Sequence, residues 1–316
     1  MPNFTFLLPA YKKDFLGEAL SSIRHQTYPD FKVLVSDDCS PYDLKTIFDE
    51  TVGDDPRFEY RRNEKNIGGT SLVAHWNLLV DLCDTEFLIM ASDDDIYAPD
   101  FLKEIEELSR KWTDVDIYRS RARKVNGKEE TIAEDFPSPE HESQIDFLYD
   151  WFCLRKVSCI ANYVFRTSAL RSIGGFVDFP LAWGSDEATV LLLSIHGACT
   201  TPSVNFSFRL SGQNISTRTE KNIMHTKMQA RLMFIDFLKQ YFAAFAVGDN
   251  ALSLRRYREF KSDYMDSLYT QLRDDAVHLC WSDAYLCFRH LKKNKRLSGF
   301  LEKLHYIWAW LKIRIR

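Results

Sequence analysis

The sequence lacks the features that mark several common classes of protein. No stretch approaches the roughly 18 uninterrupted apolar residues of a membrane-spanning helix. The first apolar run is too short for a signal peptide and follows no basic region, so we expect a cytoplasmic protein. The seven cysteines are scattered and never spaced as C-x-x-C, which favours reduced thiols over a disulfide framework or a zinc site. The formal net charge of -4 argues against a dedicated nucleic-acid binder.

Glycine-rich phosphate-binding loops are also missing from the start of the chain. The first predicted strand ends in PAYKKD, which contains no glycine, whereas a dehydrogenase would carry G-x-G-x-x-G there. A sugar-phosphate nucleotidyltransferase would also need a glycine-rich loop at this point. The 316 residues, 45% hydrophobic and 27% charged, are typical of a globular protein with one large domain or two smaller ones.

Strand-like and helix-like segments alternate in the first part of the chain. Apolar and β-branched runs predict strands at residues 3–9, 31–36, 57–62, 86–92, 115–125, 159–167 and 201–210. Apolar residues at helical spacing predict helices at residues 16–23, 44–52, 71–83 and 99–112, the last with Pro99 in its first turn. Such alternation implies βαβ units, and hence an α/β fold with a mixed, mostly parallel sheet flanked by helices.

The character of the chain changes near residue 216. From residue 217 onwards strand signals and proline disappear, and aromatic-rich amphipathic helices take over without a flexible linker. We therefore expect one domain at residues 1–216 and a C-terminal helical region at 217–316 packed on it. Its basic last stretch, from residue 292, suits peripheral contact with an anionic inner-membrane surface. This stretch also has an apolar helical face. The alternative is that this face packs on the sheet domain or on a second subunit of a homo-oligomer.

Two acidic clusters follow predicted strands. Asp37 and Asp38 follow the second strand, and Asp93, Asp94 and Asp95 follow the fourth. Because the carboxyl ends of parallel strands meet at one edge of a sheet, we expect five carboxylates at one crevice. Their mutual repulsion needs a compensating cation, and Mg2+ takes such oxygen ligands together with substrate phosphates. The clusters therefore predict a metal and nucleoside-diphosphate site, although aspartates also cap helices and form turns.

These motifs occur in an order that resembles the family-2 glycosyltransferases, nucleotide-sugar-dependent enzymes with the GT-A fold. The segment FTFLLPAYKKDFLGEALSSIRHQTYPDFKVLVSDDCSP is similar to the family's usual start. The segment NEKNIGGTSLVAHWNLLVDLCDTEFLIMASDDDIYAPDFL resembles its succession of N-x-G, helix, strand and DXD motif. The resemblance covers about residues 3–216.

The resemblance implies an inverting, metal-dependent glycosyltransferase that uses Mn2+ or Mg2+. Such an enzyme moves a sugar from a nucleoside-diphosphate sugar, with UDP the expected nucleotide, to a hydroxyl group. The acceptor would be a glycan or a lipid-linked molecule in cell-surface polysaccharide synthesis. The alternative is a catalytically silent family member that binds nucleotide or glycan as an assembly partner.

The resemblance also implies roles for individual donor-site residues. Tyr11 would lie against the nucleobase, and Asp38 would accept a hydrogen bond from the base. Asp93 would contact the ribose or the donor sugar. Asp94 would be the principal metal ligand and Asp95 a lesser one. Further donor-site matches are Pro9, Asn66, Gly68 and Asn77.

The family's catalytic base lies in an acidic pair after a GGF turn. Here residues 174–176 supply the turn, and Ser185-Asp186 stands where many relatives have Glu-Asp. The resemblance assigns the base to Asp186, which would deprotonate the acceptor hydroxyl, with Asp178 as the second candidate. The alternative is that Ser185 or Asp186 only caps a helix.

Two further positions depart from the family pattern. In AHWN, His75 replaces a residue that is often a cation near the phosphates, and a partly buried helix histidine is an equally good interpretation. The segment FSFRLSGQNIST resembles the family's closing segment, with Ser211 where a histidine is common. Arg209 in this segment would contact the phosphates.

Overall fold

The computed structural model describes residues 3–152, 155–244, 255, 257–259, 261, 262, 264, 267 and 268. The chain divides into two compact units. The first comprises Met1–Asp178 and Ser185–Asn214, and the second comprises Phe179–Gly184 and Ile215–Arg316. The basic helix predicted from residue 292 onwards lies outside the described residues.

The first unit is built around one mixed sheet. Its strands are β1 (Phe4–Ala10), β2 (Phe31–Asp37), β3 (Phe58–Arg62), β4 (Phe87–Met90), β5 (Ile96–Tyr97), β6 (Ile117–Asn126), β7 (Thr131–Glu134), β8 (His141–Glu142), β9 (Tyr163–Arg166) and β10 (Ala198–Leu210). The hydrogen-bonded order is β3-β2-β1-β4-β9-β6-β10-β5, with β7 beside β6 and β8 beside β10. Strands β1 to β4 pair in parallel, as do β6 and β10, whereas β9 is antiparallel to both its neighbours. The predicted mixed α/β sheet is confirmed.

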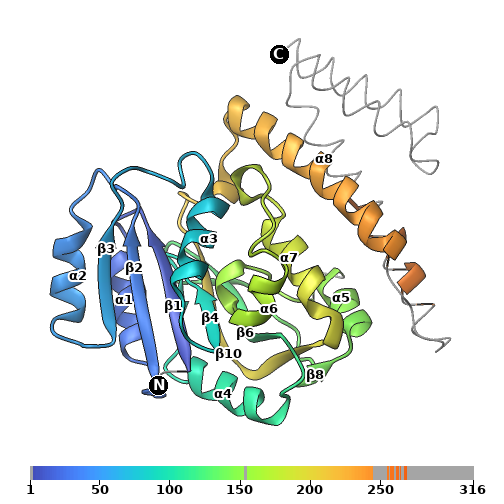
Figure 1. Cartoon of the computed structure of the whole chain (residues 1–316), viewed down its shortest axis with the longest axis horizontal. Coiled ribbons are helices and arrows are strands. Elements are labelled where there is room, and N and C mark those ends of the chain that lie inside the picture. Colours follow the sequence, from blue (N-terminus) through green and yellow to red (C-terminus); the bar gives the residue numbers. More distant parts are fainter. Residues whose placement is uncertain are drawn as a thin grey trace. The chain divides into compact units, whose positions relative to one another are not determined.

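Helices surround this sheet (Figure 1). They are α1 (Leu16–Arg24), α2 (Leu44–Val52), α3 (Leu72–Leu82), α4 (Phe101–Lys111), α5 (Gln144–Phe152), α6 (Thr167–Ser172) and α7 (Ser185–Leu193). Asp43 and Ser71 cap α2 and α3, since their side chains accept hydrogen bonds from backbone N–H groups of the first turn. Pro99 was predicted in the first turn of α4, but the helix begins at Phe101 because the Pro99 carbonyl pairs with the N–H of Thr27.

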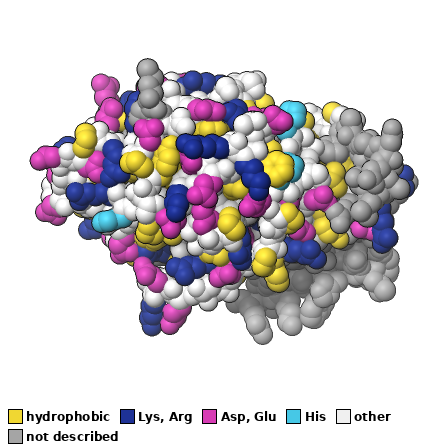
Figure 2. All heavy atoms as spheres, turned by 90° about the horizontal axis from the view of Figure 1, so that it is seen from below, with side chains coloured by type: hydrophobic (Ala, Val, Ile, Leu, Met, Phe, Trp, Pro, Cys, Tyr) yellow, Lys and Arg dark blue, Asp and Glu magenta, His cyan; other side chains and the backbone are white. Residues whose placement is uncertain are grey.

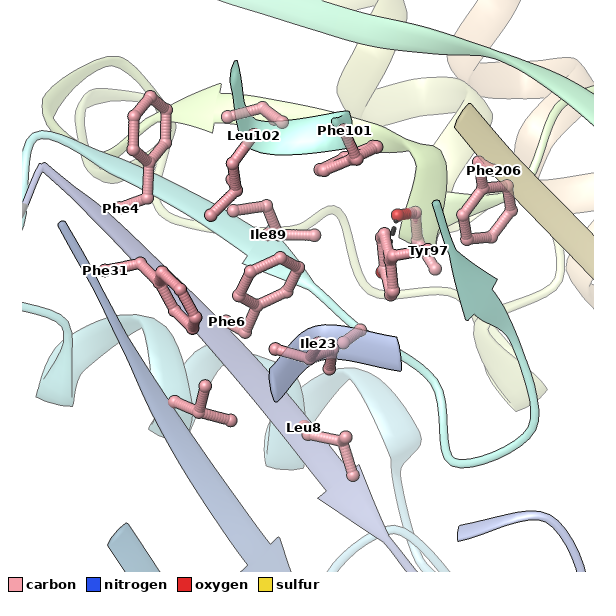
Figure 3. Packing of buried hydrophobic residues seen from close by; sticks show 14 of the residues in the cluster. Phe4, Phe6, Leu8, Ile23, Phe31, Ile89, Tyr97, Phe101, Leu102 and Phe206 are labelled. Atoms are coloured by element: carbon pink, nitrogen blue, oxygen red, sulfur yellow. Dashed lines mark hydrogen bonds between the residues drawn. The ribbon is translucent and has the colours of Figure 1, made fainter. Parts of the chain in front are cut away.

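Aromatic rings form the centre of the core between the sheet and its helices (Figure 3). The ring of Phe6 in β1 meets that of Tyr97 in β5 edge-on, with centroids 5.1 Å apart. Tyr97 also contacts Phe101 of α4 and Phe206 of β10, and its hydroxyl donates to the carbonyl of Ala161 at 2.8 Å. Edge-on pairs of this kind are each worth about 0.5–1.5 kcal/mol beyond the area they bury. The short strand β5, which follows the second acidic cluster, is therefore fixed from several sides.

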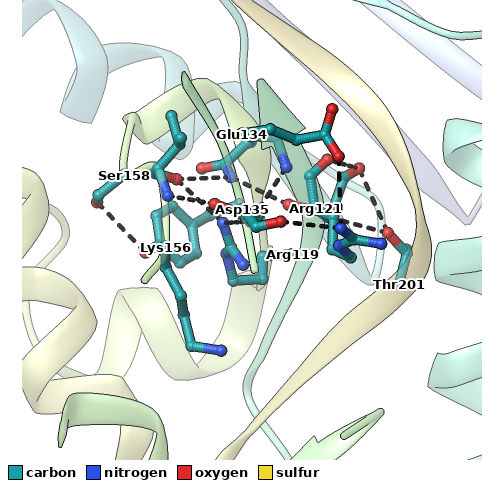
Figure 4. Close-up of polar contacts among 12 residues, drawn as sticks. Arg119, Arg121, Glu134, Asp135, Lys156, Ser158 and Thr201 are labelled. Carbon is teal, nitrogen blue, oxygen red and sulfur yellow. Dashed lines mark hydrogen bonds and ion pairs between the residues drawn. The ribbon is translucent and has the colours of Figure 1, made fainter. Parts of the chain in front are cut away.

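A buried polar cluster supports the other half of the sheet (Figure 4). Arg119 of β6 is fully buried and donates to the Asp135 carboxylate at 2.6 Å and to the carbonyl of Val157 at 3.0 Å. The Asp135 carboxylate also accepts from the N–H of Ala122 at 3.1 Å. Nearby, the buried Lys156 ammonium pairs with Glu142. The Arg119 charge is paired with Asp135 through Nη2, while its Nε and Nη1 are buried without a hydrogen-bond partner among the described residues. The cluster ties the segment after β7 to the sheet.

The register of the parallel strands brings their carboxyl ends to one edge. Ala10, the last residue of β1, pairs with Asp37, the last residue of β2. Leu7 of β1 pairs with Met90 of β4, and its carbonyl also accepts from the N–H of Ala91. Both acidic clusters therefore leave the sheet at the same edge.

The second unit contains α8 (Lys221–Ala244) and the segment 179–184. Within this unit the rings of Phe234 and Phe237 on α8 lie against that of Phe179. Gly184 adopts a φ of +90°, and an added Cβ would come within 3.3 Å of the Phe234 ring. The segment is thus packed closely on α8.

The described helices do not include one that is both long and apolar enough to cross a membrane. On the face shown in Figure 2, basic and acidic side chains alternate rather than gather into an area of one sign. This distribution does not provide the extended basic surface that nucleic-acid binding needs on that face.

Truncation of Phe6 tests the importance of the aromatic core. We expect Phe6→Ala to lower the free energy of unfolding by about 3–5 kcal/mol, because the ring is fully buried and its neighbours cannot fill the space. Urea unfolding followed by circular dichroism measures this change. Ile132→Ala is the control, since Ile132 is 56% exposed, and should change the value by less than about 0.5 kcal/mol. Similar losses in both variants would contradict the assignment of Phe6 to the core.

Candidate active site

The turn that follows β1 joins the two acidic clusters. The backbone N–H groups of Tyr11 and Lys12 both donate to Asp93 Oδ2, at 3.1 and 2.8 Å. On the other side, the hydroxyl of Ser40 donates to the Tyr11 carbonyl at 2.7 Å. The Tyr11 side chain itself remains 42% exposed, and Pro9 is half-buried just before it in β1.

The ammonium group of Lys12 lies between two buried carboxylates. Its Nζ is 2.8 Å from Asp93 Oδ1 and 2.6 Å from Asp94 Oδ2. Burial lowers the pKa of Lys12, but the two carboxylates outweigh it, and the net pKa lies above the usual range of a lysine. Burial also raises the pKa of Asp93, with Lys12 counteracting it. The charge repulsion predicted for this cluster is thus relieved by a side chain that the sequence analysis did not assign.

Asp94 receives further hydrogen bonds from its surroundings. Its Oδ1 accepts from the hydroxyl of Ser92 at 2.6 Å. Its Oδ2 accepts from the hydroxyl of Ser211 at 2.8 Å and from the amide of Asn214 at 3.4 Å. The serine that replaces the family's common histidine therefore contacts the predicted metal ligand directly.

Arg209 holds the end of β10 against the third aspartate. Its backbone N–H donates to Asp95 Oδ1 at 2.9 Å, and its Nε donates to the Asp94 carbonyl at 3.1 Å. Its side chain is 2% exposed and pairs with Glu18 of α1 at 2.5 Å and with Glu129 at 3.3 Å. In this structure the guanidinium pairs with two carboxylates and links β10, α1 and the acidic cluster. The phosphate contact that the resemblance implies for Arg209 stays a prediction.

Asp38 organises the loop that follows β3. Its Oδ1 accepts from the amide of Asn63 and the N–H of Ile67, both at 2.9 Å, and its Oδ2 accepts from the N–H of Gly68 at 2.7 Å. An added Cβ at Gly68 would lie 2.9 Å from Asp38 Oδ2, so this close approach requires glycine. In the same turn, Asn66 Oδ1 accepts a hydrogen bond from the N–H of Gly69. Three predicted donor-site residues, at positions 38, 66 and 68, are thus brought together.

His75 is buried below this loop. Its Nε2 lies 2.9 Å from the hydroxyl of Ser36 and 3.3 Å from the amide nitrogen of Asn63. Because that nitrogen can only donate, Nε2 accepts and the proton of the neutral ring belongs on Nδ1, which faces Asp38 at 3.6 Å. Burial lowers the pKa of His75. The structure therefore favours the buried-histidine interpretation over a phosphate-binding cation.

Asn77 contacts the GGF turn rather than the acidic edge. Its side chain accepts from the N–H of Phe176 at 2.8 Å and donates to the Phe176 carbonyl at 3.1 Å. Gly175 has a φ of +91°, and an added Cβ there would lie 2.5 Å from the Asn77 amide oxygen. The N–H of Val177 then donates to Thr189 of α7 at 3.0 Å. Asn77 thus positions the turn that leads to α7, and its donor-site assignment stays a prediction.

Asp186 is the second residue of α7. Burial raises the pKa of this carboxyl group, while the backbone N–H groups at the start of the helix act in the opposite direction. The Cys159 thiol lies 3.8 Å from Asp95 Oδ2, and its pKa is raised by burial and by the charges of Asp95, Asp186 and Asp94. Cys159 therefore contacts the acidic cluster through Asp95 and is affected by the charge of Asp186. Asp178, the second candidate base, lies 3.5 Å from the hydroxyl of Ser71.

The oxygen atoms at this edge of the sheet could bind a divalent cation such as Mg2+ or Mn2+. Among the described residues, no group of three or more His, Cys, Asp or Glu side chains is arranged to hold a metal ion by itself. A cation position nevertheless exists between Asp93 Oδ1 and Asp94 Oδ2, since an ammonium group already occupies it. The hydroxyl of Ser211 adds a neutral oxygen beside Asp94. One or two carboxylates are what Mg2+ uses when substrate phosphates supply other ligands.

The family follows from comparison with known proteins. The model of the family described as glycosyl transferase family 2 matches residues 5–173, more than half of the chain. The chain belongs to glycosyltransferase family 2. Its fold is the GT-A fold that its motifs indicated.

Two curated relatives match this glycosyltransferase over part of their length. A GalNAc(5)-diNAcBac-PP-undecaprenol beta-1,3-glucosyltransferase of Campylobacter jejuni is 31% identical over 96 residues, 30% of this chain and 30% of that protein. The succinoglycan biosynthesis protein ExoW of Rhizobium meliloti is 32% identical over 122 residues, 37% of each chain. The matched part thus spans about a third of the length of these relatives.

Solved structures extend the likeness to most of the chain. TarS of S. aureus in complex with UDP-GlcNAc has a TM-score of 0.58 at 15% identity, covering 87% of this chain and 86% of that one. The mannosyltransferase PcManGT of Pyrobaculum calidifontis, in complex with GDP-Man and Mn2+, has a TM-score of 0.53 at 15% identity, covering 98% of this glycosyltransferase and 86% of PcManGT. At this level of identity the likeness establishes the fold.

Protonation of His75 should weaken the fold in mild acid. Below the unfolded-state pKa of about 6.5, the unfolded chain takes up a proton that the buried ring resists, so the free energy of unfolding falls as the pH falls. Between pH 7 and pH 5 we expect the wild type to lose more of its free energy of unfolding than His75→Gln does, as measured by urea unfolding. His25→Gln, at an exposed position, should behave as the wild type. Equal pH dependence of wild type and His75→Gln would contradict the buried neutral ring.

Proposed function

We propose that this glycosyltransferase is an inverting, metal-dependent enzyme that uses a nucleoside-diphosphate sugar. The observation that carries the proposal is the meeting of the Asp38 loop and the Asp93–Asp94 pair, with its cation position, at one edge of the sheet. These two groups match two requirements of the reaction, a nucleobase site and a diphosphate site. Asp186, at the start of α7, is the proposed proton acceptor.

The nucleobase would lie between Tyr11 and Asp38. The Tyr11 ring is exposed, while its backbone is fixed by Asp93 and Ser40, so it can stack on a planar ligand without first being ordered. A base N–H group would approach Asp38 Oδ2, which accepts from the N–H of Gly68 and faces His75 Nδ1 at 3.6 Å. UDP is the proposed nucleotide, and the UDP-GlcNAc complex of TarS supports it as far as the shared fold allows.

The diphosphate would lie at the Asp93–Asp94 pair. Asp94, assisted by Asp95 and Asp93, would hold Mn2+ or Mg2+ there. The bound ion would offset the negative charge that develops on the departing diphosphate. The Mn2+ complex of PcManGT supports a metal in this fold.

Asp186 would act as the general base. It would take the proton of the acceptor hydroxyl as that oxygen bonds to the anomeric carbon from the face opposite the diphosphate. The bond from the anomeric carbon to the diphosphate breaks in the same step, and the configuration inverts. A raised pKa makes the ionised Asp186 a stronger base than an exposed aspartate.

The acceptor is proposed to be a glycan or a lipid-linked glycan of cell-surface polysaccharide synthesis. One relative is named for an undecaprenol-linked acceptor and another for succinoglycan biosynthesis. The reaction would take place in the cytoplasm, close to the membrane if the acceptor is lipid-linked.

A nucleotide screen provides the first test of the proposal. UDP, GDP and their sugar conjugates, each with and without Mn2+, should include at least one that raises the melting temperature, because a ligand of the native state stabilises it. Absence of any shift would contradict the nucleotide site. A nucleotide that binds without any sugar transfer would favour a catalytically silent binding protein.

Two substitutions test the catalytic assignment once a donor is known. Asp186→Asn should lower kcat by about 10²–10⁴-fold, because the amide cannot accept the proton, and Asp94→Ala should abolish the metal-dependent activity. Initial rates of transfer measure both effects. Glu187→Gln is the matched control for the first, since it removes a neighbouring charge on the same helix turn. Full activity of Asp186→Asn together with loss in Asp178→Asn would move the base to Asp178.

The pH dependence of the reaction gives an independent test of Asp186. The group must be ionised to accept a proton, and burial raises its pKa, so the rate should fall in acid at a higher pH than for an ordinary aspartate of pKa about 3.9. The profile of kcat/KM against pH between 4 and 8 measures this limb. A flat profile down to pH 4 would exclude Asp186 as the base.

A further inference from the structure

The Asp93–Asp94 pair already has a counter-ion in the free protein. The Lys12 ammonium contacts one oxygen of each carboxylate, at 2.8 and 2.6 Å. The side chains of Asp93 and Asp94 are only 6% and 3% exposed, whereas that of Lys12 is 27% exposed. Water therefore screens these two carboxylates little, and the neighbouring ammonium supplies most of the compensation.

A metal held between Asp93 and Asp94, as the ammonium is, would use the Asp94 oxygen that faces Lys12. Asp94 Oδ2 accepts from Lys12, Ser211 and Asn214, and Asp94 Oδ1 is held by Ser92. A carboxylate oxygen cannot bind an ammonium group and a divalent cation at the same position, because the two cations repel one another. Binding of a metal at Asp94 therefore requires the ammonium to move away.

The backbone of Lys12 can remain in place during this movement. Its N–H is bonded to Asp93 Oδ2 at 2.8 Å, on the oxygen that the ammonium does not contact. The side chain is a flexible four-carbon stem that ends in a strongly hydrated point charge, so it can turn outwards at little steric cost. A diphosphate that arrives with the metal would offer the displaced ammonium new anionic partners.

We propose that Lys12 is an internal competitor of the metal, which occupies the cation position of the Asp93–Asp94 pair until a divalent ion displaces it. The inference rests on the proposed function for the place of the metal. It goes beyond that function because it makes Lys12 the cause of weak metal binding by the free enzyme in the absence of nucleotide. Metal and nucleotide then bind best together.

Binding of Mn2+ alone tests the competition. The free metal concentration in a titration of the full chain is followed by electron paramagnetic resonance, without nucleotide. Lys12→Met keeps a stem of similar length and removes the charge, so we expect it to bind Mn2+ at least about tenfold more tightly than the wild type. Lys13→Met is the matched control, because the Lys13 ammonium lies over the ring of Tyr42, 4.8 Å from its centroid, and does not touch the carboxylates. It should bind Mn2+ as the wild type does.

The outcomes separate this inference from the proposed function. Equal or weaker binding by Lys12→Met, or absence of Mn2+ binding in all three proteins, would overturn the competition. If Lys12→Met does not fold without metal, addition of Mn2+ must give a folded protein that shows a thermal unfolding transition. Absence of this transition would also overturn the inference. Since the titration needs neither donor nor acceptor, absence of sugar transfer by the wild type would count against the proposed function and leave this result standing.

Discussion

Compensation of buried carboxylate charge is the constraint on which the active-site edge depends. The register of β1 with β2 and β4 brings both acidic clusters to one place, where like charges in a poorly hydrated site repel. The structure compensates these carboxylates with several partners: Lys12 for Asp93 and Asp94, Arg62 for Asp37, backbone and side-chain amides for Asp38, and the backbone of Arg209 for Asp95. The same partners fix the loops that would receive the donor.

Patterns local in the sequence predicted most of the fold. Largely apolar runs identified β1 and β4, and apolar residues at helical spacing identified α1, because burial imposes these patterns directly. Strand β7 could not be found in this way, since all four of its residues are exposed and only its pairing with β6 makes it a strand. The convergence of the acidic clusters was likewise predictable, because the carboxyl ends of parallel strands lie at the same edge of the sheet.

The individual side-chain partners were less predictable, because they are distant in the sequence. Lys12 stands next to Tyr11 in PAYKKD, yet its carboxylate partners lie more than eighty positions further along the chain. The carboxylate partners of Arg209, Glu18 and Glu129, come from segments that only the folded sheet brings beside β10. The partner of Asn77, Phe176, is almost a hundred positions further along the chain. A sequence motif predicts which residue type stands at a position, but the tertiary structure determines which other residues it contacts.

The contact between Asn77 and the GGF turn also limits how the two segments can diverge. Any side chain at Gly175 would collide with the Asn77 amide, and a smaller residue at position 77 would leave the backbone groups of Phe176 without their partners. Neither position can therefore drift by single neutral steps. Among descendants of this sequence the two should change jointly or not at all, which would leave a covarying pair between a helix and a turn almost a hundred positions apart.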